Sequence, residues 1–348
     1  MSNPAVRGRG ASENPANRFH STVYERDPAP PEPGPRTTFI DDHSKSLITY
    51  NDSPDVGFDA GINPYRGCEH GCIYCYARPL HEYLGFSSGL DFESKIMVKH
   101  RAPVLLRDEL TAKKWKPQVV GVSGATDPYQ PAEHRFRLTR ACLEVFLEFR
   151  NPIVVITKNQ LVTRDIDLLA QLAEHHCVAV YVSITTRKAD LARTMEPRTS
   201  SPQARLAAIQ QLSAAGIPTG VFVAPVVPGL TDEELPAILE AAAGAGARAA
   251  GFIMLRLPHA VAAMFENWLT QHAPLRKERV LQRLREMRGG ELSESTFGDR
   301  MRGQGAYAEQ IQAMFKLACR RNGLDRKVET LSTDAFRRPG EAEQLDLL

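Results

Sequence analysis

Three cysteines lie within eight residues of the sequence and form its most informative pattern. The spacing C-x3-C-x2-C joins Cys68, Cys72 and Cys75, and Gly67 and Gly71 precede the first two. Glycine lets the backbone turn tightly, so three thiolates on such a loop can bind one metal centre. Iron–sulfur clusters ordinarily take four cysteines, so three leave one iron open to a substrate or cofactor. We therefore expect these cysteines to be metal ligands and catalytic residues.

Two other interpretations of the loop stay open. A structural zinc ion could be completed by His70 or His81, although such a site normally shows a second ligand pair further along the chain. The three cysteines could also be unliganded core residues. The other cysteines stand singly in apolar segments, as core residues do, and predict no disulfide framework. They are Cys142, Cys177 and Cys319.

The segments that would position this loop alternate between strand and helix patterns. From about residue 59, short β-branched runs alternate with helical periodicity, which predicts consecutive βαβ units and a parallel sheet. Six strands are predicted, at residues 58–63, 119–123, 153–157, 178–184, 220–226 and 252–257. Six β/α units fit a partial barrel or an open doubly wound sheet. In both folds functional groups gather at the C-terminal strand ends.

Helix signals accompany these strands. Residues 139–149 have an apolar face, and another helix is expected to begin near Pro202. Thr231 and Asp232 are expected to cap a helix that runs to Ala245.

The two ends of the chain differ from its middle. Residues 1–38 are rich in Pro, Gly, Arg, Asn and Glu, which is typical of a disordered arm. Residues 39–275 are expected to form the core barrel, and residues 276–348 a helical C-terminal extension and tail.

Charge and hydropathy narrow the class of protein. The 348 residues carry 43 Lys and Arg against 41 Asp and Glu, a net charge of only +2, so no bulk field marks an obligate nucleic-acid or membrane-surface protein. No apolar run reaches the roughly 18 residues that a membrane span needs, and the first residues lack an apolar leader. We expect a cytoplasmic protein without a membrane partner.

The cysteine loop resembles that of a known superfamily. The spacing CxxxCxxC, with Tyr74 before the third cysteine, resembles the radical S-adenosylmethionine (SAM) superfamily. Blocks from Asn63 to Pro258 are similar to an uncharacterised subgroup related to the spore photoproduct lyases. These blocks are NPYRGCEHGCIYCYARP, TDPYQPAE, ITKN, VSITT, EPRTSSPQARL and LRLP.

The resemblance implies a fold, cofactors and a reaction. The fold would be an α/β partial (β/α)6 barrel of the TIM type. The cofactors would be a [4Fe-4S] cluster and SAM, with a reductant such as flavodoxin or ferredoxin. The reaction would cleave SAM reductively to a 5′-deoxyadenosyl radical, which abstracts hydrogen from a substrate that the sequence does not identify.

The resemblance also implies cofactor contacts at the strand ends. Thr126 and Asp127 stand where the superfamily holds the methionine ammonium group, although Asp127 could instead only cap a turn. Lys158 matches a lysine of the related lyases and would pair with the methionine carboxylate, unless it is a plain exposed strand-end residue. The hydroxyl of Ser183 would bind the ribose.

Aromatic and arginine side chains complete the candidate set. Tyr74 and Tyr76 flank the third cysteine and would contact the adenine or shield the cluster from water. Arg198 would hold a carboxylate or phosphate, or else pair with Glu196 on the surface. Arg256 is given no role, since it could point into the barrel, where a buried guanidinium needs a partner, or lie at the barrel mouth.

Comparison with the lyases restricts the substrate. They carry a hydrogen-donating cysteine just before the Ser-Asp pair, whereas residues 124–127 here are Gly-Ala-Thr-Asp. Thymine-dimer repair is therefore not expected, and hydrogen would return from 5′-deoxyadenosine or pass through a residue such as Tyr129. Nucleic acid stays a possible partner, because residues 276–302 hold eight Lys and Arg against five Asp and Glu, and RGRG stands at 7–10. The alternative function is a non-catalytic zinc- or cluster-stabilised nucleic-acid-binding module.

Overall fold

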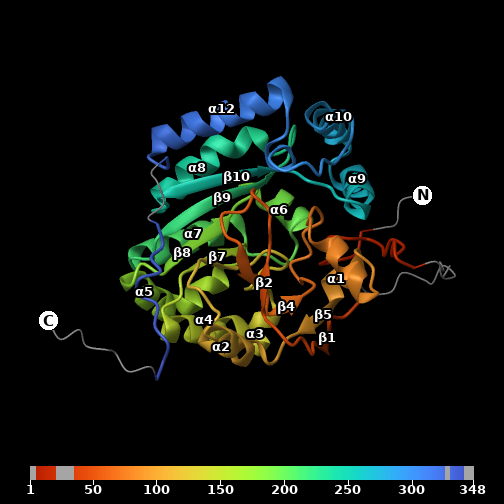
Figure 1. Cartoon of the computed structure of the whole chain (residues 1–348). Coiled ribbons are helices and arrows are strands. Elements are labelled where there is room, and N and C mark those ends of the chain that lie inside the picture. Colours follow the sequence, from red (N-terminus) through yellow and green to blue (C-terminus); the bar gives the residue numbers. More distant parts are fainter. Residues whose placement is uncertain (1–4, 21–34, 326–329, 341–348) are drawn as a thin grey trace.

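The computed structural model describes residues 5–20, 35–325 and 330–340, and its centre is a seven-stranded sheet (Figure 1). Its strands are β2 (Ile48–Tyr50), β3 (Ala60–Ile62), β6 (Val120–Val122), β7 (Ile153–Thr157), β8 (Val178–Ser183), β9 (Thr219–Val226) and β10 (Ala249–Met254). Their order is β10-β9-β8-β7-β6-β3-β2, parallel throughout except that β2 runs antiparallel to β3. In the described part of the chain, β10 pairs with no strand other than β9. The predicted parallel α/β sheet is confirmed, and it is open rather than closed.

Five of the six predicted strands match within two residues at each end, whereas the last lies three residues earlier than predicted. The observed β10 begins at Ala249 with the sequence Ala-Ala-Gly. A Cβ on Gly251 would lie 2.4 Å from the ring of Phe222 in β9, so this position requires a small residue. Small residues carry little hydrophobic signal, and the sequence pattern therefore placed the start at the first large side chain. One consequence is that Arg256 lies beyond the strand.

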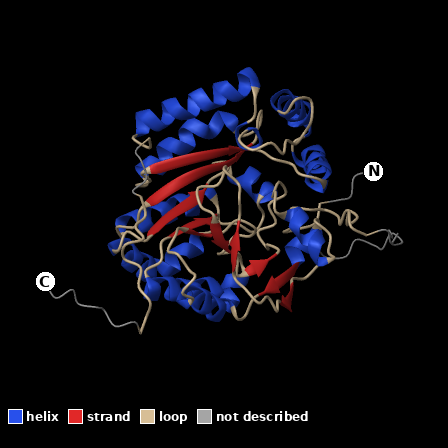
Figure 2. Ribbon diagram, in the orientation of Figure 1, coloured by secondary structure: helices blue, strands red, loops and turns tan. Residues whose placement is uncertain are grey.

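Helices follow the strands and lie on the outer side of the sheet, while the loops gather near the strand arrowheads (Figure 2). Those between the strands are α2 (Ala102–Thr111), α3 (Ala132–Phe136), α4 (Leu138–Phe149), η2 (Gln160–Asp165), α5 (Ile166–Glu174), α6 (Ala189–Met195), α7 (Pro202–Ala214), η3 (Asp232–Glu234) and α8 (Leu235–Gly244). None of the described helices is long and apolar enough to cross a membrane.

The predicted helix starts are correct at α4 and α7 but not at α8. Ser201 caps α7 by accepting a hydrogen bond from Ala204 N. Thr231 does not cap its helix, because its hydroxyl instead accepts from Val227 N, 2.9 Å away. The chain then makes the 3-10 turn η3 before α8 begins at Leu235.

Helices also follow β10 and pack on the core. They are α9 (Ala260–His272), η4 (Pro274–Arg276), α10 (Lys277–Met287), α11 (Asp299–Arg302) and α12 (Gly305–Asn322). Of these, α10, α11 and α12 lie within residues 276–348, and the boundary of the extension stays a prediction. In Figure 1, α12 lies outside α8, and the rings of Phe315 and Phe252 lie 4.7 Å apart. Residues 330–340 return past the α4 end, where the Phe336 ring lies 6.3 Å from Phe149.

The N-terminal part builds a second, smaller sheet beside the core. It consists of β1 (Thr38–Asp41), β5 (Lys95–Val98) and β4 (Tyr65–Arg66), with η1 (Arg78–Leu84) and α1 (Leu90–Ser94) next to it. Residues 5–20 were expected to be part of a disordered arm, but the structure places them against α1 and η1 (Figure 1). The reason is a set of buried hydrogen bonds described below. Residues 21–34 of the predicted arm lie outside the described residues.

Candidate active site

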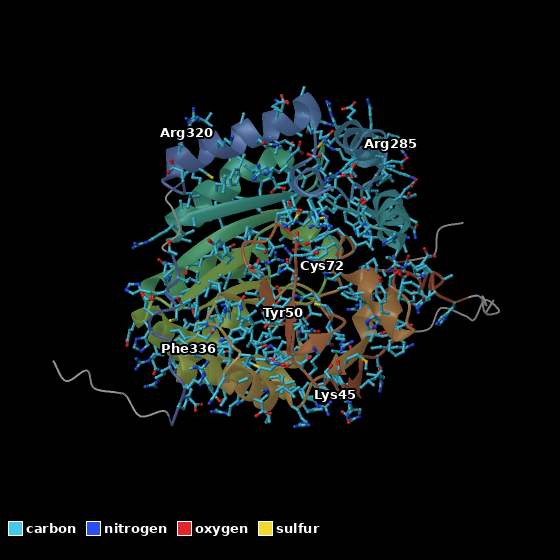
Figure 3. All side chains as sticks on the ribbon, viewed as in Figure 1. Lys45, Tyr50, Cys72, Arg285, Arg320 and Phe336 are labelled. Atoms are coloured by element: carbon cyan, nitrogen blue, oxygen red, sulfur yellow. The ribbon has the colours of Figure 1, made fainter. Side chains whose placement is uncertain are left out.

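The cysteine loop joins β4 to η1 and lies over the C-terminal ends of the parallel strands. Figure 3 labels Cys72 near the middle of the view, on the side toward which β9 and β10 point. The loop is anchored where Cys68 N donates to Phe92 O, at 2.9 Å. Gly67 has a φ of +76°, and a Cβ there would lie 3.0 Å from two backbone oxygens, so only glycine fits this turn.

The three thiols occupy buried positions near charged residues at the strand ends. Cys68 and Cys72 are each 7% exposed, and Cys75 is half-buried. Burial raises the pKa of Cys68, and the neighbouring charge of Asp127 adds to this. Burial likewise raises the pKa of Cys72, with Glu196 adding to it and Lys158 opposing it. Thiolates at these positions require a bound cation to offset their burial.

A buried ion pair between Arg78 and Glu93 fixes the backbone of the cysteine loop. The guanidinium of Arg78 donates to Cys72 O at 3.0 Å and to Gly71 O at 3.2 Å, and its Nη2 lies 2.5 Å from Glu93 Oε1. Both side chains of the pair are fully buried. Removing one partner would leave an uncompensated buried charge, which costs about 3–5 kcal/mol. Arg78 therefore fixes the backbone from which the cysteines project.

The N-terminal segment is attached to the same carboxylate. Glu93 also accepts hydrogen bonds from Gly10 N at 3.0 Å and Ala11 N at 2.8 Å. The guanidinium of Arg9 donates to the backbone oxygen of Glu93 at 2.5 Å. A Cβ on Gly10 would lie 1.8 Å from Gly71 O, so the segment packs directly on the cysteine loop. Its RGRG sequence, which resembled part of a flexible arm, thus has a packing role.

The donor set fits a cluster better than a single ion. In the described part of the chain, no three His, Cys, Asp or Glu side chains are arranged to hold one metal ion. His70 has both ring nitrogens engaged, by Asp127 at 3.4 Å and Asn159 at 3.1 Å, so it is not free to complete a zinc site. In an iron–sulfur cluster each cysteine binds a separate iron, so the thiols need not meet at one point. Three thiols without a fourth ligand fit a [4Fe-4S] cluster with one open iron.

Asp127 lies between the loop and two strand ends, and both of its oxygens are engaged by the protein. One accepts from the Thr157 hydroxyl at 2.7 Å and from Tyr129 N at 2.9 Å, and the other accepts from Lys158 N at 2.7 Å. Burial alone would raise the pKa of this carboxyl, but the charge of His70 and these hydrogen bonds hold it below its usual value. The geometry favours the turn-capping alternative for Asp127 over a contact with the methionine ammonium group.

Thr126 has a similar internal role. Its backbone nitrogen donates to Asn63 Oδ1 at 3.1 Å, and its hydroxyl donates to Tyr65 O at 3.3 Å. Asn63 also accepts from Ala125 N at 3.0 Å, so this side chain joins the end of β3 to the turn after β6. The proposed SAM contact of Thr126 stays a prediction.

Lys158 belongs to a buried network centred on Glu196. Its ammonium donates to Ala224 O at 2.7 Å, lies 3.8 Å from Glu196 Oε1 and lies 5.9 Å from the centre of the Tyr74 ring. Lys158 therefore does not fit the plain exposed alternative. Tyr74 donates its hydroxyl to Glu196, and its predicted contact with the adenine stays a prediction.

Glu196 and Arg205 form the second buried ion pair beneath the site. Burial would raise the pKa of Glu196, but Arg205, Lys158 and the hydrogen bonds from Tyr74 and Thr185 lower it to about 2. Arg205 also donates to Ser183 O at 3.0 Å, which connects the pair to the end of β8. The alternative that paired Arg198 with Glu196 on the surface is wrong, because Glu196 is buried and pairs with Arg205.

Arg198 pairs instead with a residue of the cysteine loop. Its Nη1 lies 2.9 Å from Glu69 Oε1, a carboxylate that also accepts from the Thr37 hydroxyl at 2.8 Å. This pairing fixes Arg198 without an external anion. Ser183 lies at the end of β8 and is 5% exposed.

Tyr76 and Arg256 lie at the opposite edge of the loop. Tyr76 is 49% exposed, and its hydroxyl donates to the backbone oxygen of Gly124, after β6. The guanidinium carbon of Arg256, just after β10, lies 5.4 Å from the centre of the Tyr76 ring. By contrast, Tyr129 is fully buried near Asp165 and Glu133, away from this edge. Tyr129 therefore does not border the exposed side of the loop.

The family model of the radical SAM superfamily matches residues 62–242, more than half of the chain. This match includes the three cysteines and the strands from β6 to β9. The chain belongs to the radical SAM superfamily.

Curated relatives of this radical SAM protein are similar over only part of their length. An uncharacterised protein of Mycobacterium tuberculosis (strain H37Rv) is 40% identical over 215 residues, which cover 61% of this chain and 63% of the relative. An uncharacterised protein of Methanocaldococcus jannaschii is 31% identical over 173 residues, which cover 50% and 62%. The chain thus matches less than two thirds of the length of these relatives, and their names state no activity.

Solved structures of spore photoproduct lyase share the fold. A complex with dinucleoside spore photoproduct has a TM-score of 0.56 and 16% identity, and the match covers 81% of this chain and 79% of that chain. A variant with bound AdoMet and dinucleoside spore photoproduct has a TM-score of 0.56 and 17% identity, covering 81% and 78%. Identity this low shows a common fold and no more.

Sequence reasoning missed the groups that hold the radical SAM motif in place. Most of them act through partners that are distant in sequence, so the spacing of residues along the chain did not indicate which side chains interact. A partial signal existed for Glu196 and Arg205, since both lie within the EPRTSSPQARL block. The residues that were missed are Arg9, Gly10, Asn63, Arg78, Glu93 and Arg205.

Proposed function

We propose that this chain is a radical SAM enzyme in which Cys68, Cys72 and Cys75 hold a [4Fe-4S] cluster. The observation that carries the proposal is the loop itself, which lies over the strand ends with the thiols of Cys68 and Cys72 buried and that of Cys75 half-buried. When bound, the cluster supplies the electron that cleaves SAM to methionine and a 5′-deoxyadenosyl radical, which takes a hydrogen atom from the substrate.

The residues of this chain bind and orient the cofactors. Arg78 and Arg205 hold the loop and the end of β8, so that little rearrangement is needed when the cofactors bind. Ser183 and Lys158 remain our candidates for ribose and carboxylate contacts, with the ammonium of Lys158 already directed toward the strand ends. Asp127 positions Lys158 through its backbone nitrogen rather than binding SAM directly.

The aromatic residues control access to the cysteines. Tyr74 is 6% exposed and packs in the same apolar cluster as Cys72, which excludes water from that side of the loop. Tyr76 is half exposed and covers the opposite side. We assign Tyr74 to shielding and Tyr76 to the adenine or substrate side.

The substrate differs from that of the lyase that shares the fold. One of the lyase structures is a complex with dinucleoside spore photoproduct. In this chain the turn after β6 is Gly-Ala-Thr-Asp at residues 124–127 and lacks a thiol. We therefore propose a radical reaction other than thymine-dimer repair, in the cytoplasm, with electrons from a protein such as flavodoxin or ferredoxin.

Anaerobic reconstitution tests the proposal. The wild-type protein is treated with iron and sulfide, and iron per chain and 5′-deoxyadenosine released from SAM under a strong reductant are measured. We expect about four irons per chain and reductant-dependent 5′-deoxyadenosine. Replacing Cys68, Cys72 or Cys75 by Ala should abolish both, whereas Cys319→Ala, which removes a buried thiol of α12, should keep both.

Two results would contradict the proposal. About one zinc per chain and no iron would support the zinc-stabilised module instead. Iron-loaded protein that never cleaves SAM would support the cluster but contradict the proposed enzymatic function.

A further inference from the structure

We propose that Arg256, together with Arg288 and Arg300, forms a binding site for an oxyanion of the substrate, a phosphate or a carboxylate. These three residues are called the arginine group below. The inference rests on the proposed function, because it places the substrate beside the cysteine loop. It names a chemical class for a substrate that is otherwise unidentified.

The arginine group lies at the edge of the candidate active site. Arg256 follows the C-terminal end of β10, and its guanidinium stacks near Tyr76, the residue after Cys75. Tyr76 in turn contacts Gly124, after β6. A molecule bound by Arg256 would therefore lie at the strand ends, next to the half-exposed Tyr76 and close to the cysteines.

Arg256 lacks the carboxylate that a half-buried guanidinium normally has. Within residues 5–20, 35–325 and 330–340, its hydrogen-bond partner is the sulfur of Met301, 3.6 Å from Nη1. A thioether sulfur is a weak, neutral acceptor and does not balance the charge. Most of the five N–H donors of this guanidinium are therefore left for a ligand.

The neighbouring residues leave the group with an excess of positive charge. Arg300 has a carboxylate partner, Asp55, at 2.5 Å. Arg288 donates only to backbone oxygens, namely Leu255 O at 2.8 Å and Asp299 O and Arg300 O at 2.9 Å each. Its Nε is buried without a hydrogen-bond partner among the described residues. Three guanidinium groups thus share one directly paired carboxylate.

The acidic groups on the adjoining loop are directed elsewhere. The carboxylate of Glu294 accepts from its own turn, at Thr296 N, and Asp299 Oδ2 accepts from Gln304. Burial and repulsion from Arg256 lower the pKa of Arg288 to about 10, although the charges of Glu294 and Asp299 act in the opposite direction. An anion placed between them would remove this repulsion and satisfy free donors.

An oxyanion is the ligand that matches these donors. A guanidinium presents parallel N–H groups that bind two oxygens of a phosphate or carboxylate at once. The ring of Tyr76 also suits a ligand site, because it offers a flat apolar surface beside the guanidinium of Arg256. The arginine group could also bind the carboxylate of SAM, so the test must distinguish an oxyanion of the substrate from SAM.

The experiment compares binding of inorganic phosphate and of SAM. Full-length protein, reconstituted with iron and sulfide, is titrated with phosphate and separately with SAM, and dissociation constants are measured by calorimetry. The variants are Arg256→Gln and Arg256→Lys, and the control is Arg320→Gln, an exposed arginine on α12 (Figure 3). Circular dichroism and iron content verify that each variant is folded and loaded.

We expect Arg256→Gln to weaken phosphate binding about tenfold or more, because the variant loses a charged hydrogen-bond donor. Its affinity for SAM should be unchanged. Arg256→Lys should bind with intermediate affinity, because charge is kept but the paired donors are lost. Arg320→Gln should bind like wild type.

Two results would overturn the inference. Equal phosphate affinity in Arg256→Gln and Arg320→Gln would show that no oxyanion site is formed. A loss of SAM affinity in Arg256→Gln would assign the arginine to the cofactor instead. Failure of the proposed function looks different, because the wild-type protein would then lack iron or SAM binding while the phosphate comparison could still be read.

Discussion

The cysteine loop lies between two regions that treat buried positive charge in opposite ways. On one side, which we call the braced side, Arg78 pairs with Glu93 and Arg205 pairs with Glu196. On the other side, the arginine group of Arg256, Arg288 and Arg300 has one paired carboxylate, Asp55. Both regions contact the cysteine loop, yet only on the braced side are the arginine charges balanced by carboxylates of the protein.

This difference distinguishes arginines that support the fold from arginines that can bind a ligand. On the braced side, the donors of Arg78 end on Glu93, on backbone oxygens of the loop, or on the oxygens of Ser88 and Gly89 before α1, so no group remains for a ligand. In the arginine group, Arg256 is half-buried, and its hydrogen-bond and ring partners within the described part of the chain are the sulfur of Met301 and the ring of Tyr76. Charges that are balanced within the protein stabilise it, whereas charges left unbalanced at the edge of a site are available to a ligand.

The largest expected effect is on the braced side. Glu93→Gln removes the negative partner of Arg78 and weakens the acceptor of two backbone amides, at Gly10 and Ala11. We expect the free energy of unfolding to fall by about 3–5 kcal/mol, because a buried charge loses its partner. Denaturant unfolding at neutral pH measures this change. A control, Glu240→Gln on the exposed side of α8, should alter stability by less than about 0.5 kcal/mol.

The pH dependence of Glu196 gives the second prediction. Its pKa is lowered from 4.5 to about 2 in the folded protein, so its contribution is complete above pH 4.5 and is lost as the pH falls toward 2. The full contribution is on the order of 3 kcal/mol. The free energy of unfolding is measured between pH 7 and pH 3 for wild type and Glu196→Gln. The difference between the two should shrink as the pH falls, and a constant difference would contradict the assignment.

The third prediction concerns the N-terminal segment of the braced side. Gly10→Ala would place a methyl group 1.8 Å from Gly71 O. The backbone of Gly10 cannot yield without breaking its hydrogen bond to Glu93, nor that of Gly71 without breaking its hydrogen bond from Arg78. We expect a loss of about 1–3 kcal/mol, typical of overpacking, together with faster proteolysis within residues 5–20. Gly244→Ala is the matched control, because a Cβ there meets nothing within 4 Å. Equal behaviour of the two variants would mean that the segment does not pack on the loop in solution.

Local signals in the sequence predicted much of the fold. The apolar run at Ile153–Thr157 gave β7 to the residue, since a buried parallel strand is continuously apolar. The cysteine spacing likewise identified the loop, because its ligands are close in sequence. The start of β10 was missed because Gly251 is required by its neighbour Phe222, a contact that a single segment does not reveal.

The polar framework of the site was harder to predict. Glu93 collects hydrogen bonds from residues 10, 11 and 78, and no periodic pattern connects such positions. Asp127 was placed correctly at a strand end, but sequence alone could not show that its oxygens are already engaged. The alternative partner of Arg198, Glu196, was suggested by proximity in sequence, whereas the fold brings Arg198 to Glu69.

The smallest expected effect is in the arginine group, and it tests the comparison most directly. Arg256→Gln removes a charge that has no carboxylate partner among the described residues and that Arg300 repels. We expect the free energy of unfolding to change by less than about 0.5 kcal/mol, or to rise slightly, in contrast with the losses on the braced side. Urea unfolding without added anions measures it, and phosphate should then stabilise wild type more than the variant. A loss comparable to that of Glu93→Gln would show that Arg256 supports the fold, and the distinction between the two sides would fail.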